Sequence, residues 1–298
     1  MTGAAPVLDA LVALRGQGLS YNSRKGVYCP TNAIYWLKEC NKSSSNTIII
    51  TNLADSGKKS VSQVTIAVEP TFVHDLVRGR DVGRWTWDSK LKVILPQDPK
   101  QPAKAVPEAA LKTKHPKTFG YFEKFEKEIR DCALLAQFFD PELDPFYSSY
   151  NVGHYTYAKF KVVWKEISNE IEATVIESNG TTIIPDHKLV LVAFDKAEPA
   201  YFLSGILNSS PVGLFIRSYG VQTSISGHIF EYMNIPSYSR SDLIHKEVVD
   251  IARQCHTARD AQLANLEERL DLAVAKALSI PAKHSKVMRK ELRVLRDG

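Results

Sequence analysis

Short patterns that carry catalytic chemistry are almost missing from the sequence. Acid-x-lysine patterns of the kind found in nucleases occur at residues 88–90 (DSK) and 186–188 (DHK), but neither has a second acid on a predicted neighbouring strand. The run SGKKS at residues 56–60 lacks the earlier glycine that completes a phosphate-binding loop. We therefore assign no catalytic residue and no metal ligand, and keep a metal-dependent nuclease as an alternative.

Three arginines alternate with glycines in the run LVRGRDVGRW at residues 76–85. A guanidinium on a glycine-relaxed turn can approach a phosphate or bind a guanine edge through two hydrogen bonds. We therefore predict that Arg78, Arg80 and Arg84 contact DNA. In the alternative interpretation, Arg80 and Asp81 pair with local partners and fix the turn.

A tyrosine-rich loop, DPELDPFYSSYNVGHYTY, follows at residues 140–157. Its phenol groups could contact phosphates or stack near a distorted base step, and its amide and imidazole side chains could read base edges. One or two of the tyrosines could instead anchor the loop in the core. The DNA-binding candidates from this loop are Tyr147, Tyr150, Asn151, His154 and Tyr157.

Lysines alternate with apolar residues after this loop, which predicts a strand with a lysine face and an apolar face. Lys159 and Lys161 share the lysine face and are predicted to contact backbone phosphates, or else to be ordinary solvated lysines. The polar loop after Gly220 contains Gln222 and Ser224, whose side-chain types read adenine or thymine edges.

The basic residues are unevenly distributed. Residues 76–117 contain ten lysines and arginines against four acids and end at Lys117, a further candidate phosphate contact. Residues 165–200 contain three lysines against seven acids, whereas the tail from residue 281 contains six basic residues against two acids. A positive end and a negative end would orient a polyanion on the protein surface.

Length and composition indicate a folded, unsecreted protein. The chain has 298 residues, of which 44% are hydrophobic and 24% charged, with a formal net charge of +5. It has no apolar run of membrane-spanning length, and its N-terminal residues lack the cationic region of a signal peptide. The four cysteines lack zinc-binding spacing, which is typical of a cytoplasmic protein.

Strands and helices are intermixed up to residue 238, so we predict an α/β or mixed α+β fold. The expected strands lie at residues 46–52, 64–68, 92–96, 160–164, 173–177, 181–184 and 188–194. The expected helices lie at residues 71–79, 117–139, 199–209 and 212–219.

The last 60 residues have a different pattern. A capping-box pattern begins at Ser239, and an apolar stripe at helical spacing continues, with one phase slip, to Pro281. This predicts one amphipathic helix of about 40 residues that packs against another helix, in its own chain or in a partner through self-association. We therefore divide the chain into a DNA target-recognition domain (residues 1–238) and a helical segment with a basic tail (residues 239–298).

Several segments occur in a recognisable order between residues 15 and 237. They are RGQGLSYNSRKGVYCP at 15–30, Glu69 before LVRGRDVGRW at 76–85, HPKTFGYF at 115–122, FKVVW at 160–164, FLSGILNSS at 202–210 and ISGHIFEYMNIP at 225–236. In this order the chain resembles the C-terminal specificity, or target-recognition, domain of TaqI-like and Type IIG adenine DNA methyltransferases. Type I restriction specificity subunits carry a related domain.

The resemblance implies a cytoplasmic restriction-modification protein that binds double-stranded DNA and reads base edges beside a methyltransferase catalytic domain. The sequence has no Asn-Pro-Pro-Tyr motif, and residues 144–147 (DPFY) lack its second proline. S-adenosylmethionine is therefore expected on a catalytic domain or subunit outside this chain. The alternative from a different class is an assembly scaffold whose long helix recruits partners.

Overall fold

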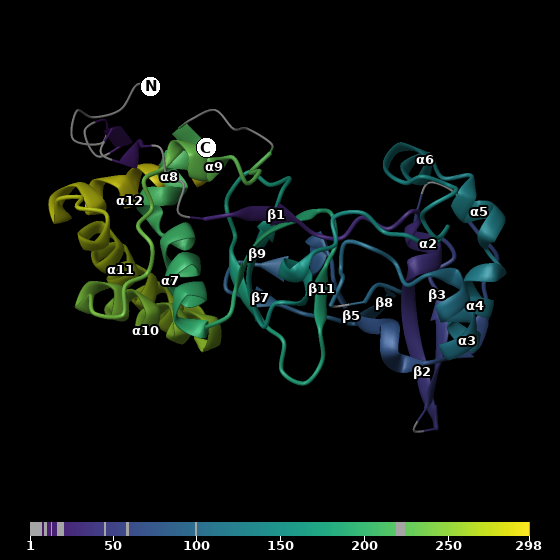
Figure 1. Cartoon of the computed structure of the whole chain (residues 1–298). Coiled ribbons are helices and arrows are strands. Elements are labelled where there is room, and N and C mark those ends of the chain that lie inside the picture. The colour runs from purple at the N-terminus through teal and green to yellow at the C-terminus, as the bar shows by residue number, and fades with distance from the viewer. Residues whose placement is uncertain are drawn as a thin grey trace.

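The computed structural model describes residues 8, 11–12, 14–16, 21–44, 46–57, 60–98, 100–218 and 224–297. The molecule is elongated, with a mainly helical end, a six-stranded sheet at the other end and a four-stranded sheet between them (Figure 1). The predicted mixture of strands and helices in one fold is confirmed.

The six-stranded sheet has the order β11-β5-β8-β2-β3-β4, and all of its pairs are antiparallel except β11 with β5. Its strands are β11 (Ile183–Pro185), β5 (Val73–Val77), β8 (Leu91–Ile94), β2 (Trp36–Ser44), β3 (Thr47–Asn52) and β4 (Thr65–Val68). Five short helices belong to this end: α2 (Asn32–Tyr35), α3 (Glu108–Lys114), α4 (Pro116–Glu123), α5 (Glu126–Arg130) and α6 (Ala133–Phe138). Phe122, Phe146 and Tyr147 join the sheet residues in one buried cluster.

Two helix predictions in this region are wrong. The segment predicted as a helix at residues 71–79 is a short 3-10 turn, Pro70–Phe72, followed by strand β5. Its apolar pattern suits either structure, and pairing with β8 on one side and β11 on the other decides for the strand. The single helix predicted at residues 117–139 is divided into α4, α5 and α6, with non-helical backbone at Phe125 and Cys132.

The four-stranded sheet has the order β1-β12-β9-β10, with all pairs antiparallel. Its strands are β1 (Ser23–Lys25), β12 (Leu189–Phe194), β9 (Phe160–Lys165) and β10 (Thr174–Glu177), and a small hairpin of β6 (Val82–Gly83) and β7 (Thr86–Trp87) lies beside it. The strands predicted at residues 160–164, 173–177 and 188–194 are thereby confirmed. Phe160, Val162 and Trp164 pack towards the helices, whereas Val163 packs on the opposite face of the sheet.

The helical end contains α7 (Ala197–Asn208), α8 (Ser210–Ser218), α9 (Ile229–Tyr232), α10 (Leu243–Thr257), α11 (Asp260–Ala277) and α12 (Ala282–Asp297). The predicted 40-residue helix is therefore wrong: it is broken between α10 and α11. Ala258 and Arg259 have extended backbone, and Asp260 has a φ of +48°. The phase slip in the apolar stripe marks this break, and Asp242, not Ser239, caps α10.

The apolar stripe of these helices is covered within the chain. α10 packs against α7 and α11, and α12 packs against α8 and α11. Val248, Leu270 and Leu292 belong to the same buried cluster as Val162 and Trp164 of β9. The prediction that this apolar stripe packs against another helix is thus confirmed within the chain. Helix-mediated self-association was expected because the stripe needed a partner, and the chain itself supplies that partner. A boundary after residue 238 marks the start of all-helical structure, but the helices beyond it share their core with the sheet.

His256 connects α10 to the edge strand β10. Its Nε2 accepts a hydrogen bond from the Val175 backbone N–H at 3.1 Å, and its Nδ1 lies 2.7 Å from the Ala252 carbonyl oxygen. Burial lowers the pKa of His256 from 6.5 to about 4. The neutral ring therefore stabilises the fold above pH 6.5, and this stability is lost as the pH falls towards the folded-state pKa.

We expect protonation of His256 to lower the free energy of unfolding by about 2 kcal/mol between pH 7.5 and pH 5, because a protonated Nε2 can no longer accept from Val175. In His256→Gln the side chain keeps an acceptor that does not titrate. Urea denaturation of both proteins at the two pH values should show a smaller pH dependence in the variant by about that amount. Equal pH dependence would contradict this role of His256.

Candidate nucleic-acid interface

Two of the three predicted arginines have internal partners. The Arg78 Nε and Nη2 atoms donate to the two oxygens of Asp81, each at 2.8 Å. The Arg84 Nε donates to Glu267 Oε1 at 2.6 Å, and its Nη2 donates to the Asn208 carbonyl oxygen. Asp81 thus fixes the turn as the alternative interpretation expected, but through Arg78. Arg80 is exposed and has no hydrogen bond or ion pair within the described ranges.

The candidates in the tyrosine-rich loop also fall into two groups, some packed inside the protein and some exposed. Tyr147 is completely buried and donates its hydroxyl to the Val106 carbonyl oxygen, and Tyr157 packs edge-on against the His74 ring. Both tyrosines anchor the loop and are not available to DNA in this conformation. Tyr150 is exposed and stacks on Phe138 with ring centroids 4.0 Å apart, Asn151 has a φ of +57°, and His154 is exposed.

Lys161 does not lie on a solvent face as expected. Its side chain is 0% exposed, because the face of β9 that carries it is covered by the cluster containing Val77, Val82 and Ile183. Its Nζ donates to the Ala158 carbonyl oxygen at 2.6 Å. Burial lowers the pKa of Lys161 to about 7. We therefore withdraw it as a phosphate contact.

A Lys161→Met variant should fold at least as stably as the wild-type protein and bind DNA equally well. The gain in the free energy of unfolding should be about 2 kcal/mol larger at pH 6 than at pH 9, because the charged form of a lysine with a lowered pKa is disfavoured in the folded state. Denaturation at the two pH values and a binding titration check both statements. A loss of DNA affinity without unfolding would restore Lys161 to the interface.

Three separate segments meet where the chain passes from the four-stranded sheet to the six-stranded sheet. Gly26 lies so close to the turn after β11 that a Cβ built on it would be 2.1 Å from the Asp186 carbonyl oxygen. Val27 forms a β-bridge with Asp186, and Tyr28 forms one with Tyr150. The Tyr28 ring packs on the His187 ring at 4.3 Å between centroids. Glycine is required at position 26 because any side chain would push these segments apart.

The arginine-glycine turn adjoins the same place. A Cβ built on Gly79 would lie 3.3 Å from the Lys188 Cβ, so the exposed side chains of Arg80 and Lys188 come from neighbouring backbone segments. We call the exposed parts of residues 24–28, 78–80, 150–154 and 187–188 the junction surface.

Cations and aromatic rings together make up the junction surface. The Arg24 guanidinium lies over the Tyr155 ring at 5.9 Å, and Lys25 pairs with Glu166 at 2.7 Å while staying half-exposed. Burial, with the neighbouring charges of Lys188 and Lys25, lowers the pKa of His187 to about 4, so this ring is neutral at pH 7. Flat rings beside exposed cations can contact both the sugar-phosphate backbone and exposed base faces.

Sequence reasoning missed much of this surface. In the sequence, the segment at residues 15–30 contains Arg24, Lys25 and Tyr28 without marking them as DNA contacts. Residues 186–188 form a nuclease-like pattern there. Asp186 is in fact buried, and its carboxylate accepts a hydrogen bond from the Lys188 backbone N–H. Gly26 follows Arg24 and Lys25 directly, and a glycine beside cations can indicate a close approach of the backbone to another segment. This local signal could have identified the junction surface.

The other predicted contacts are scattered. Ser224 is exposed and precedes Ile225, whose N–H donates to the carbonyl oxygen of Glu166, the partner of Lys25. Ser224 therefore lies beside the junction surface, whereas Gln222 lies outside the described residues. Lys117 is exposed on α4, and the exposed Lys159 lies with its Nζ over the Phe160 ring; no contact among the described residues joins either to the junction surface.

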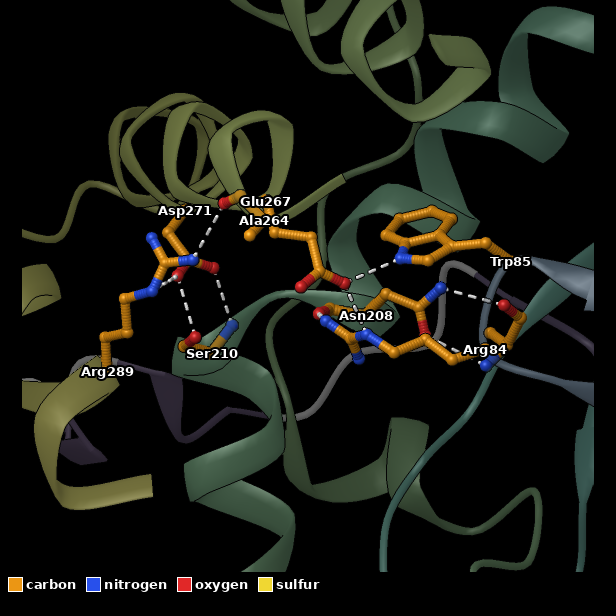
Figure 2. A network of polar contacts seen from close by, with 9 residues as sticks. Arg84, Trp85, Asn208, Ser210, Ala264, Glu267, Asp271 and Arg289 are labelled. Carbon is orange, nitrogen blue, oxygen red and sulfur yellow. Dashed lines mark hydrogen bonds and ion pairs between the residues drawn. The ribbon is translucent and has the colours of Figure 1, made fainter. Parts of the chain in front are cut away.

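A polar network holds the helical end against the sheet (Figure 2). Glu267 of α11 accepts from Arg84 and from the Trp85 indole N–H at 2.8 Å, and the Asn208 side chain bonds both backbone groups of Ala173. Asp271 accepts from the Ser210 N–H and hydroxyl, each at 2.7 Å, and pairs with Arg289 of α12. Arg84 thus has a positioning role that links the turn between β6 and β7 to two helices, α7 and α11.

The described residues contain neither a membrane-spanning helix nor a cluster of metal ligands. None of the helices there combines the length and the apolar character needed to cross a bilayer. Nor do three or more histidine, cysteine or acidic side chains gather there as a set of metal ligands.

Comparison with known proteins shows a likeness in fold alone. No protein-family model and no curated protein matches the sequence. The fold is similar to part of the Type IIL restriction-modification enzyme MmeI, solved in complex with DNA, with a TM-score of 0.53 and 11% identity over 96% of this chain and 37% of that chain. The Type IIG restriction endonuclease BpuSI matches with a TM-score of 0.44 and 13% identity over 97% of this chain and 33% of its own. The chain therefore spans about a third of each enzyme.

Proposed function

We propose that this chain is the DNA-recognition part of a restriction-modification adenine methyltransferase and binds double-stranded DNA through the junction surface. The single observation that carries the proposal is that Arg24, Arg80 and Lys188, three exposed cations without an ion pair among the described residues, lie on adjoining segments that also carry the exposed rings of Tyr28 and Tyr150. Phosphate contacts by such cations supply much of the affinity of DNA-binding proteins.

The fold supports this proposal because MmeI, whose structure contains DNA, shares it over nearly the whole of this chain. Side chains that can read base edges lie around the cations: Asn151 and His154 in the tyrosine-rich loop, and Ser224 beside Lys25. The exposed Tyr28 and Tyr150 are positioned to pack on sugars or on an unstacked base.

In this proposal the chain selects the DNA sequence and another part of the enzyme transfers the methyl group. S-adenosylmethionine and the catalytic residues would belong to a methyltransferase domain or subunit. The junction surface would hold the duplex while the target adenine leaves the base stack.

Selection from a randomised duplex pool tests the proposal. Purified protein is mixed with the pool, and bound duplexes are recovered and sequenced over successive rounds. We expect a short motif to become enriched, with each mismatch costing about 1 to 3 kcal/mol. Recovered sequences that stay random, at a salt concentration where the protein binds DNA, would exclude sequence recognition. Absence of salt-dependent binding would exclude a DNA-binding function altogether.

A further inference from the structure

Helix α12 has one buried face and one basic face. Ser285, Met288 and Leu292 are each 2% exposed or less, and Leu292 lies against Gly213 of α8, where an added Cβ would be 3.1 Å from it. These contacts fix the rotation of α12, so the side chains opposite them point to solvent.

Four cations occupy the solvent face at intervals of three, four and three residues, the spacing that places side chains along one side of a helix. They are Lys283, Lys286, Lys290 and Arg293, all exposed. None of them forms an ion pair or hydrogen bond within the described ranges, whereas Arg289, on the side of the same helix, is 16% exposed and lies 3.6 Å from Asp271. Arg289 is therefore held by a carboxylate inside the protein, whereas the four cations of the solvent face have no such partner among the described residues.

The shape of this basic stripe suits a nucleic-acid backbone. Ten residues of helix extend about 15 Å, a length over which duplex DNA carries about nine phosphate charges. Protein interfaces are usually depleted in lysine at their centre and enriched in aromatic residues. The stripe has three lysines, and the exposed apolar side chains on the same helix, Val294 and Leu295, lie beyond its end.

The stripe connects to the junction surface through α8. Arg217, in the last turn of α8, donates to the Leu295 carbonyl oxygen and pairs with Glu170. Glu170 lies four residues along the chain from Glu166, the partner of Lys25. The Arg293 end of the stripe is therefore the end nearer to the junction surface along this path.

We propose that the solvent face of α12 is a second DNA-contact surface, which binds backbone phosphates of the duplex that flanks the segment held at the junction surface. This inference rests on the proposed function for the position of the duplex. It predicts that affinity depends on duplex length, because a short duplex reaches only one of the two surfaces.

The test uses fluorescence anisotropy with a 12-base-pair and a 40-base-pair duplex of related sequence, titrated at several salt concentrations. The variant Lys283→Gln/Lys286→Gln/Lys290→Gln/Arg293→Gln removes the stripe and keeps good helix formers. The matched control, Lys112→Gln/Lys114→Gln/Lys124→Gln/Lys127→Gln, removes the same charge from exposed positions on α3, at the end of α4 and on α5, at the opposite end of the molecule (Figure 1). Equal thermal unfolding of the three proteins shows that each is folded.

On the long duplex, the slope of log affinity against log salt should become shallower by about 3.6 in the stripe variant, at about 0.9 for each of the four lost phosphate contacts, and by less than about 1 in the control. On the short duplex, the stripe variant should bind like the wild-type protein. A wild-type slope on the long duplex in the stripe variant would overturn the inference while leaving the proposed function intact. If a variant lacking the cations of the junction surface binds both duplexes normally, the proposed function fails instead. If the wild-type protein binds neither duplex, both fail.

Discussion

The triple variant Arg24→Ala/Arg80→Ala/Lys188→Ala is expected to bind duplex DNA about 500-fold more weakly than the wild-type protein at 0.1 M salt. Each lost phosphate contact removes about 0.9 from the salt slope, which corresponds to about eightfold in affinity at this salt concentration relative to 1 M. The three side chains are exposed and form no ion pair among the described residues, so their removal should leave the fold unchanged. Anisotropy titrations from about 0.05 to 0.3 M salt measure both the affinity and the slope.

Lys124→Ala/Lys127→Ala is the control for this triple variant. Both lysines are exposed on the six-stranded-sheet end, without an ion pair in the described part of the chain. If the control loses as much affinity per charge as the triple variant, binding reflects net charge alone. The junction surface would then have no special role.

Asp271→Ala is expected to lower the free energy of unfolding by about 3 kcal/mol, the largest stability effect that we predict. Asp271 is 5% exposed and accepts two hydrogen bonds from Ser210 at the start of α8. Its removal leaves the Ser210 N–H and hydroxyl unpaired in the interior and deprives the half-buried Arg289 of a carboxylate. Urea denaturation should show a lower midpoint with an unchanged slope.

Asp271→Asn separates hydrogen bonding from charge. Burial raises the pKa of Asp271, so the neutral amide, which keeps an acceptor for the Ser210 N–H, should cost about 1 kcal/mol or less. Equal destabilisation by alanine and asparagine would show that the negative charge near Arg289, and not the capping of α8, is what stabilises the fold.

Local patterns in the sequence predicted three of the four strands of the four-stranded sheet, because alternation and β-branched runs are properties of neighbouring residues. In contrast, β1 and β2 are not among the expected strands, and β5 lies in a segment predicted as a helix. The phase slip near residue 258 also marked a true break, although it was interpreted as an irregularity of one helix.

The roles of individual basic residues were much harder to predict. Lys161 alternates with apolar residues as a surface lysine does, but β9 is covered on both faces. Arg84 pairs with Glu267, which is 183 residues away in the sequence. No local pattern reports such a partner, so composition and spacing identified the basic segment but not which of its side chains are free.

Photo-crosslinking tests most directly whether the junction surface contacts DNA. A benzophenone amino acid replaces Tyr28 in one protein and Leu243, 76% exposed at the start of α10, in another. Each protein is irradiated with a labelled 40-base-pair duplex at a concentration where the wild-type protein is saturated. We predict a crosslinked complex for position 28 and none for position 243. Crosslinking of the duplex at position 243 but not at position 28 would contradict the account.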